Sequence, residues 1–205
     1  MAESTVPDTA LSGFVAGLAD GSLRVVDLTT PLSAATPALR LPAPFANLID
    51  FSLEEVSAYN EPGPYWRHNN IHTGEHIGTH LDAPIHWISG RDGDDVSQIP
   101  VQRLIGPAAV LDLTDEVADD PDHLLSVAEV EAWEAEHGRL TAGTWLLLRT
   151  GWESRGGSEA EFLNADETGS HTPGVSVECA QWLATEREIT GLGVETVGVD
   201  AGLAG

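Results

Sequence analysis

The sequence contains no lysine, and its nine arginines are outnumbered by 33 aspartates and glutamates, which gives a formal net charge of -24. Nucleic-acid binding depends on cationic side chains that neutralise phosphates, and an anionic membrane surface attracts the same charge. We therefore expect neither nucleic acid nor a membrane as a partner. We interpret the acidity as a solvated surface that keeps the protein soluble.

Cysteine is also scarce. Cys179 is the only one in the chain, which excludes an intrachain disulfide and a cysteine-based zinc finger. No apolar run reaches the roughly 20 residues that cross a bilayer. The first ten residues, MAESTVPDTA, lack the basic and apolar segments of a secretory signal. The sequence thus predicts a cytoplasmic protein.

The chain has 205 residues, of which 41% are hydrophobic, as is typical of one globular domain. We find no repeat, low-complexity block or long linker, and we predict a single domain over residues 1–205 with residues 1–21 as an N-terminal extension. Short apolar runs bounded by turn-forming residues are typical of strands buried on both faces. Four such runs predict strands within residues 22–32, 108–113, 144–152 and 195–202. The proline-containing segment 36–48 should be extended and irregular.

Two helices are predicted among these strands. Ser126 and Glu129 form a capping box at the start of one helix, and Gly138 ends it. Ser176 caps the second helix, in residues 177–188. Their expected apolar stripes are Val127, Val130 and Trp133 in the first, and Val177, Ala180, Leu183 and Ala184 in the second. Strands that alternate with helices predict an α/β domain.

Two acidic segments, residues 90–97 and 115–123, raise the question of a calcium site. Neither matches a calcium-binding loop with its closing glutamate. We therefore predict solvated turns in both segments.

Half of the eight histidines lie in one short stretch, His72 to Trp87, with the sequence HTGEHIGTHLDAPIHW. In a strand, His76 and His80 would be about 13 Å apart, whereas on a helical turn their Cβ atoms come within about 6 Å. A shared ion therefore requires a helix-like turn. Asp82 can join the pair if the chain opens after His80, a change that Pro84 favours because it disfavours the α conformation at the preceding residue.

Two imidazoles and one carboxylate suit zinc, manganese or ferrous iron, and the sequence does not choose among them. The letters HTGEH also match the motif of inverted zinc proteases. That motif requires a regular helix, and Gly74 at its centre argues against one.

The stretch from His76 to His86, HIGTHLDAPIH, resembles the H-x-G-T-H-x-D-x-P-x-H signature of the cyclase family of metal-dependent hydrolases, which includes bacterial kynurenine formamidase and isatin hydrolase. Further segments are similar to strands and a helix of that family: RVVDLTTPLS, LIGPAAVLDLTD, TWLLLRTGW, HTPGVSVECAQWL and ETVGVDAG. The resemblance covers most of the chain from about residue 23 onward.

The resemblance implies a swivelling β/β/α-type domain with a mostly buried central sheet, in which His76, His80 and Asp82 bind the catalytic metal. It also implies that His86 is the catalytic proton-transfer residue, a role that an imidazole can perform near neutral pH. Family members continue beyond the strand that ETVGVDAG resembles. We therefore expect the C-terminal strands to be missing and the chain to be truncated.

Several other residues near the motif are weaker candidates. Tyr65, Trp66 and Trp87 flank it, and each could stack on an aromatic substrate or pack in the core. His171 lies in a predicted loop from which it could line the pocket. A last pair, His72 and Glu75, are candidates for contacts behind the metal ligands.

We expect a hydrolase that uses a metal-activated water to cleave an amide or lactam C–N bond, in an aryl formamide or a cyclic amide. The expected cofactor is zinc or manganese, the substrate is small and aromatic, and the assembly is a homodimer or larger homo-oligomer. A non-catalytic or degenerate metal-binding family member is the main alternative. A ferrous 2-oxoglutarate-type oxygenase, with His80, Asp82 and His171 as its ligands, is a further one.

Overall fold

The structure of the protein is a computed structural model that describes residues 8–61 and 63–203. The chain divides into two units, residues 1–30 and 31–205. The described part of the first unit contains helix α1 (Asp8–Asp20), which the sequence patterns do not indicate. None of the described helices is both long and apolar enough to cross a bilayer.

The strand predicted within residues 22–32 is wrong. Residues 24–33 form neither helix nor strand, and Val25 and Leu28 are 82% and 74% exposed. A short apolar run becomes a strand only when a neighbouring strand supplies backbone partners. In the described part of the chain no such partner pairs with this segment.

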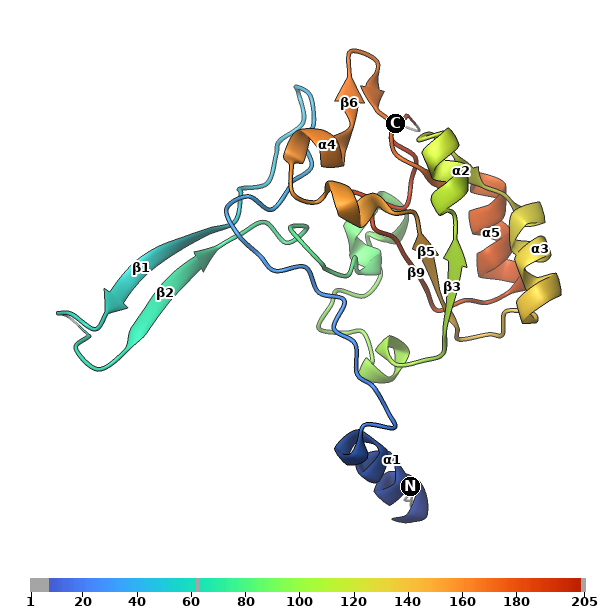
Figure 1. Cartoon of the computed structure of the whole chain (residues 1–205). Coiled ribbons are helices and arrows are strands. Elements are labelled where there is room, and N and C mark those ends of the chain that lie inside the picture. The colour runs from blue at the N-terminus through green and yellow to red at the C-terminus, as the bar shows by residue number, and fades with distance from the viewer. Residues whose placement is uncertain (1–7, 62, 204–205) are drawn as a thin grey trace. The chain divides into compact units, whose positions relative to one another are not determined.

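The second unit contains all the strands and the remaining helices of the described residues (Figure 1). Its helices are α2 (Thr114–Asp119), α3 (Val127–His137), α4 (Glu159–Leu163) and α5 (Val177–Glu186), with 3-10 turns η1 (Pro84–His86), η2 (Ile88–Gly90), η3 (Val101–Leu104) and η4 (Trp152–Arg155). Its strands are β1 (Ser52–Ala58), β2 (Arg67–His72), β3 (Ala108–Asp112), β4 (Leu124–Leu125), β5 (Trp145–Arg149), β6 (Ala165–Asp166), β7 (Gly169–Ser170), β8 (Gly174–Val175) and β9 (Gly191–Gly193).

A parallel sheet in the order β3-β5-β9 forms the centre of this unit. The strands predicted within residues 108–113 and 144–152 are confirmed as β3 and β5. The strand predicted at residues 195–202 is wrong, because the third strand is β9, just before it. Gly191 and Gly193 permit this close pairing, since a Cβ at either position would collide with the Trp145 or Leu147 side chain.

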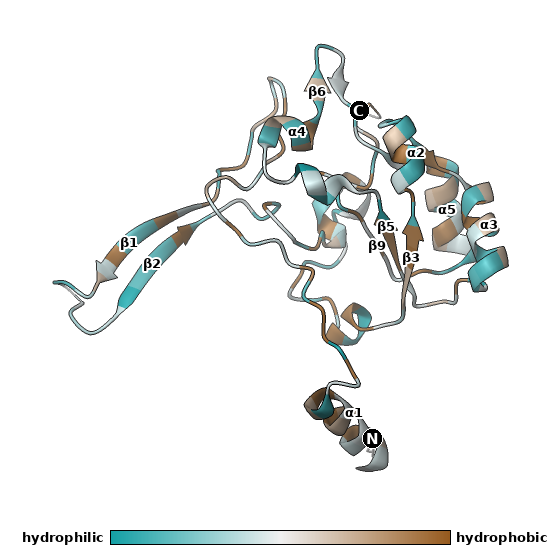
Figure 2. Ribbon diagram, in the orientation of Figure 1, coloured by the Kyte–Doolittle hydropathy of each residue, from teal (hydrophilic) through white to brown (hydrophobic). Residues whose placement is uncertain are grey.

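The main core lies on the face of this sheet that is covered by α2, α3 and α5 (Figure 1). Leu111, Leu146 and Leu148 point into it from the strands, and Val130 and Leu183 meet them from the helices. The other side of β3 is more open, since Val110 is 52% exposed. Figure 2 shows the contrast between the apolar β3 and the more hydrophilic α3. Parallel strands joined through helices confirm the α/β class.

Both predicted helix starts are confirmed. The Ser126 hydroxyl accepts from the Glu129 backbone N–H, and the Glu129 carboxylate accepts from the Ser126 N–H, which completes the capping box of α3. Ser176 caps α5 by accepting from the N–H of Cys179. Gly138 follows the last residue of α3, as expected.

The predicted stripe of α3 is confirmed, because Val127, Val130 and Trp133 all pack in the main core. The predicted stripe of α5 is largely wrong. Leu183 is buried in the core as predicted, but Val177 is 74% exposed and Ala180 and Ala184 are exposed too, so the side that packs on the core carries Cys179 and Trp182 beside Leu183. The Ser176 cap sets the start of this helix but not its rotation, which follows the side chains that bury the most apolar surface.

The acidic segment 115–123 is also corrected. Its first half belongs to α2, which buries Val117 in the core, so only the second half is a turn. The irregular segment predicted at residues 36–48 is confirmed. Arg40 in this segment holds Glu159 at the start of α4 and Asp50, with both ion pairs at 2.7 Å.

Candidate metal centre

The segment that carries the histidine cluster joins β2 to η1 and contains no helix or strand in residues 73–83. It is anchored by Ile77, which is buried in a small core with Ala38 and Phe51. Gly78 has a left-handed φ of 73°, a conformation that glycine adopts without strain. A Cβ at this position would also collide with Leu32.

This left-handed bend replaces the helix-like turn that the sequence predicts between His76 and His80. It still brings the two imidazoles together, with ring centroids 5.0 Å apart. The chain then opens as predicted, because Ala83 before Pro84 is extended, with φ -79° and ψ 156°.

His76, His80 and Asp82 form one group, here called the Asp82 cluster. Ligand atoms of the three residues all lie within 4.8 Å of one another. Asp82 Oδ1 is 2.7 Å from His76 Nδ1 and 3.2 Å from His80 Nε2. The imidazoles are mostly covered, with side-chain exposures of 21% for His76 and 27% for His80, while Asp82 is more open at 43%.

The hydrogen bonding of His80 fits a cation at this cluster. Its Nδ1 lies 2.7 Å from the carbonyl oxygen of Gly78, so Nδ1 carries the proton and donates it. In neutral His80 the lone pair is then on Nε2, which faces the carboxylate of Asp82. Two acceptors that face each other require a cation or a proton between them. A backbone partner on the second nitrogen is also the usual support of a metal-binding histidine.

His86 and Trp87 lie beside the Asp82 cluster. The ring centroid of His86 is 4.0 Å from that of His76, and the Trp87 ring meets His86 edge to face at 4.9 Å. His86 is the last residue of η1, and Trp87 directly follows it. Trp87 is 52% exposed and so offers a free aromatic surface next to His86.

The other two aromatic candidates sit on the connection between β1 and β2. The rings of Tyr65 and Trp66 lie 6.3 Å apart, and Trp66 stacks on His68 at the same centroid distance. Tyr65 is 84% exposed. Their aromatic contacts are therefore with each other and with His68, at the far end of the β1-β2 hairpin from the histidine stretch.

His72 and Glu75 take different positions around the motif. Glu75 Oε1 lies 3.7 Å from His76 Nε2, so Glu75 is next to the Asp82 cluster. His72 ends β2 and instead contacts Glu54 of β1 at 3.0 Å. Because His72 belongs to a strand, it does not share a regular helix with His76, and the inverted zinc-protease motif is excluded.

Glu54 is a polar residue that the sequence patterns do not single out. It accepts from Asn70 and contacts His72, and these two hydrogen bonds, Asn70 first, lower the pKa of its carboxyl. The register of the hairpin, which pairs Glu54 with Asn70, would have revealed this contact. No sequence signal fixes that register in advance, because the strands bulge between Glu55 and Ser57.

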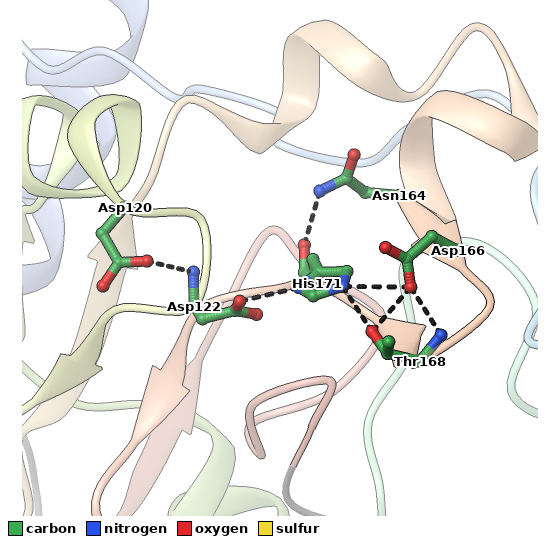
Figure 3. A network of polar contacts seen from close by, with 6 residues as sticks. All are labelled: Asp120, Asp122, Asn164, Asp166, Thr168 and His171. Atoms are coloured by element: carbon green, nitrogen blue, oxygen red, sulfur yellow. Dashed lines mark hydrogen bonds and ion pairs between the residues drawn. The ribbon is translucent and has the colours of Figure 1, made fainter.

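His171 does not join the Asp82 cluster. It lies between Asp122 and Asp166 in a separate group, here called the His171 cluster (Figure 3). The oxygenase alternative needs His171 beside His80 and Asp82, so this placement removes its third ligand.

A cavity of about 200 Å³ opens at the carboxyl ends of β3 and β5, beside Thr114, Thr150 and Arg155. Its polar side chains are already engaged: Thr114 donates to Asp112, Thr150 donates to Glu195, and Arg155 stacks over Trp152. None of its lining residues belongs to the Asp82 cluster. The cavity is therefore separate from the candidate metal centre.

Comparisons with a family model, with known sequences and with solved structures all match this chain to one family. Residues 26–201 match the family model "Cyclase". Isatin hydrolase of Roseibium aggregatum is 46% identical over 200 residues, which cover 96% of this chain and 76% of that protein. The solved structure of isatin hydrolase A from Ralstonia solanacearum superposes with a TM-score of 0.94 at 48% identity, over 99% of this chain and 78% of that one. Kynurenine formamidase of Bacillus cereus is 27% identical over 85% of this chain and 69% of its own length.

Proposed function

This chain belongs to the cyclase family, and we propose that isatin, a lactam fused to an aromatic ring, is its substrate. The protein is a hydrolase that cleaves amide or lactam C–N bonds with water. Identity of 46% to an isatin hydrolase, against 27% to a kynurenine formamidase, favours the cyclic amide over the open-chain formamide.

We propose that His76, His80 and Asp82 hold one divalent cation, either zinc or manganese. The observation that carries this proposal is the grouping of ligand atoms of the three residues within 4.8 Å of one another, with His80 Nε2 3.2 Å from the Asp82 carboxylate and His80 Nδ1 held by the Gly78 carbonyl. Two imidazoles and one carboxylate are a donor set that suits both metals. When bound, such a cation polarises a carbonyl and lowers the pKa of a water molecule toward neutrality.

His86 is the residue that we assign to proton transfer. Its ring lies 4.0 Å from that of His76, close enough to serve a substrate at the cluster without being one of the three grouped ligands. In the hydrolysis, a water oxygen bonds to the lactam carbonyl carbon and the C–N bond breaks. His86 accepts one proton from the water and gives it to the departing nitrogen, which leaves an arylamine and a carboxylic acid, and the acid then loses its proton to solvent to give the carboxylate.

Trp87 is the aromatic side chain that we assign to substrate contact. Its exposed ring adjoins His86, so a flat aromatic lactam stacked on it would lie beside the proton-transfer group. Tyr65 and Trp66 remain candidates for substrate contact. They would reach a substrate only if the β1-β2 hairpin lies over the Asp82 cluster of the same chain or of another copy.

We further propose a homodimer or larger homo-oligomer that acts in the cytoplasm. Exposed apolar residues on the hairpin, such as Leu53 and Ile71 at 55% and 67%, support an interface there. A buried free cysteine, Cys179, is compatible with a reducing compartment. Light scattering of the purified protein tests the assembly.

The experiment that tests the function is a substrate panel run with metal-free protein and with protein reloaded with zinc or manganese. The panel contains isatin, an aryl formamide and an aromatic lactone of similar size. We expect metal-dependent turnover, with isatin preferred. Preference for the formamide would reject isatin as the substrate, and bound metal without turnover of any compound would support the non-catalytic alternative.

A further inference from the structure

His171 connects two segments of the chain through its side chain (Figure 3). Its Nδ1 lies 2.7 Å from Asp122 Oδ2, in the loop between α2 and β4. Its Nε2 lies 3.3 Å from Asp166 Oδ1 of β6 and 3.1 Å from the hydroxyl oxygen of Thr168. Asp122 and His171 are 49 positions apart in the sequence, so this contact is a tertiary one.

The contacts of Thr168 show which form of His171 the site requires. The Thr168 hydroxyl donates to Asp166 Oδ1 at 2.6 Å, so its single hydrogen is committed and its oxygen can only accept from His171. Each nitrogen of the His171 ring therefore faces acceptors alone. A neutral imidazole donates from one nitrogen, whereas an imidazolium donates from both. The geometry thus selects the protonated form.

The charges around His171 also favour its protonated form. Oδ1 of Asp122 is buried and has no hydrogen-bond partner among the described residues. A covered carboxylate oxygen without a donor is costly unless a cation lies close by. His171 is the one residue of the group in Figure 3 that can carry positive charge, against the carboxylates of Asp120, Asp122 and Asp166.

Other titratable groups near the cluster do not supply a second cation. On the loop before β4, His123 is paired with Glu129 of α3 at 2.8 Å. In the turn after β6, Glu167 adds a further acidic residue. The segment that bonds to Thr172 through the N–H of Gly202 contributes Asp200, which is also acidic.

The cluster lies where two short parallel strands begin. Asp122 comes just before β4, and His171 comes just before β8, which pairs with β4 through Leu124 and Gly174. The backbone N–H of His171 donates to the carbonyl oxygen of Asn164 at 3.0 Å, and the Asn164 side-chain amide donates to the carbonyl oxygen of His171 at 2.8 Å. These two hydrogen bonds close the β6-β7 hairpin. An ion pair at this position therefore joins the hairpin to the loop that leads into β4.

We propose that His171 is a pH-dependent ionic link that holds the β6-β7 hairpin to the loop between α2 and β4, and that this link weakens in alkaline solution. The inference is independent of the proposed function, because none of these residues belongs to the Asp82 cluster.

The direction of the pH effect follows from the contacts. The hydrogen bond to Asp122 is the largest cause that raises the pKa of His171 above the ordinary 6.5, and Asp166 adds to it. A pKa raised by folding gives stability that is fully present below pH 6.5 and is lost as the pH rises through the folded pKa. The link should therefore be intact in weakly acidic and neutral solution and open at higher pH.

The experiment combines NMR titration of the histidine rings with hydrogen exchange of residues 164–172, from about pH 5 to about pH 10, a range that spans the imidazole titration. Exchange is corrected for its intrinsic pH dependence. We expect His171 to titrate above 6.5 and the hairpin to lose protection in the same pH range. The loss should be about tenfold for each unit by which the folded pKa exceeds the ordinary value.

Variants separate this link from a structural role of the side chain. His171→Gln should show low protection that no longer changes with pH, while His137→Gln, a matched change of an exposed histidine on α3, should behave as wild type. If His171→Gln does not fold, Asp122→Asn and Asp166→Asn remain. Both should lower the pKa of His171, and Asp122→Asn should lower it more. A wild-type His171 that titrates at or below 6.5, or equal pH dependence in wild type and His171→Gln, overturns the proposal.

Discussion

The Asp82 cluster and the His171 cluster use the same two chemical groups in opposite proportions. In the first, two imidazoles face one carboxylate oxygen, at 2.7 and 3.2 Å. In the second, one imidazole lies between two carboxylates, at 2.7 and 3.3 Å. The two clusters therefore contain the same residue types and differ in the proportion of imidazoles to carboxylates.

The difference lies in what each cluster leaves unsatisfied. A single imidazole between two carboxylates satisfies its neighbours by taking up a proton, so the His171 cluster needs nothing from solution but that proton. Around Asp82, Nδ1 of His80 donates to Gly78, while Nε2 of His80 and Nδ1 of His76 both face the single carboxylate of Asp82, which leaves room for a cation or a proton between them. We infer that this cluster is completed by a cation from outside.

The largest expected effect comes from removing an imidazole of the Asp82 cluster. His80→Ala should abolish metal binding and reduce isatin hydrolysis by more than about 100-fold, the upper end of losses seen when only a supporting partner of a ligand is replaced. Elemental analysis and turnover of the purified variant measure both effects. His137→Ala is the control and should keep both properties, and full activity in His80→Ala would refute the metal centre.

The next largest effect should separate chemistry from metal binding inside the same region. His86→Gln should keep the metal and lose about 10²–10⁴-fold in turnover, the usual contribution of a proton-transfer residue. Turnover and metal content are measured on the same sample, across pH. If the variant loses its metal instead, His86 is a ligand and the assignment of roles is wrong.

Metal removal should affect the two clusters differently. A ligand present at 100 times its dissociation constant stabilises the folded state by about 2.7 kcal/mol. Added metal should therefore raise the melting temperature of wild type and of His171→Gln, but not of Asp82→Asn. Thermal unfolding with and without a chelator measures this. A metal response that survives in Asp82→Asn and disappears in His171→Gln would reverse the comparison.

The smallest effect is expected from Thr168. Thr168→Val removes the hydroxyl that lies between Asp166 and His171, and it should lower the free energy of unfolding by about 0.5–1.5 kcal/mol, the range for one hydrogen bond. Denaturant unfolding measures this change, and isatin turnover should stay at the wild-type rate. Loss of turnover would mean that the His171 cluster takes part in the chemistry.

Local signals account for the parts of the fold that the sequence predicts. The caps at Ser126 and Ser176 are predicted correctly because a capping hydroxyl bonds to the backbone only a few residues away. The strands β3 and β5 are predicted correctly because their apolar runs are long for this chain and bounded by turn formers.

The wrong assignments depend on partners elsewhere in the chain. The segment around Val25 has the composition of a strand and no strand partner among the described residues. β9 is formed by Gly-Leu-Gly, which carries little strand signal and pairs because its glycines allow close contact with β5. The strand propensity of a segment does not reveal whether a distant strand will pair with it.

The candidate site divides in the same way. His76, His80 and Asp82 lie within seven consecutive positions, so spacing alone is enough to group them. The sequence makes His171 a candidate for the pocket because Asp122, its nearest carboxylate partner, is 49 positions away and leaves no local signal. The left-handed Gly78 is not predictable either, since a helix-like turn satisfies the same spacing.

The separation of Asp122 and His171 has a consequence during synthesis of the protein. A ribosome that adds about 5–20 residues per second needs roughly 2–10 s to place His171 after Asp122, because 49 positions separate them. Throughout that interval the nascent chain carries an acidic loop without its counter-charge. The ion pair in front of β4 can therefore form only after His171 has been added. The three residues of the Asp82 cluster, by contrast, leave the ribosome almost together.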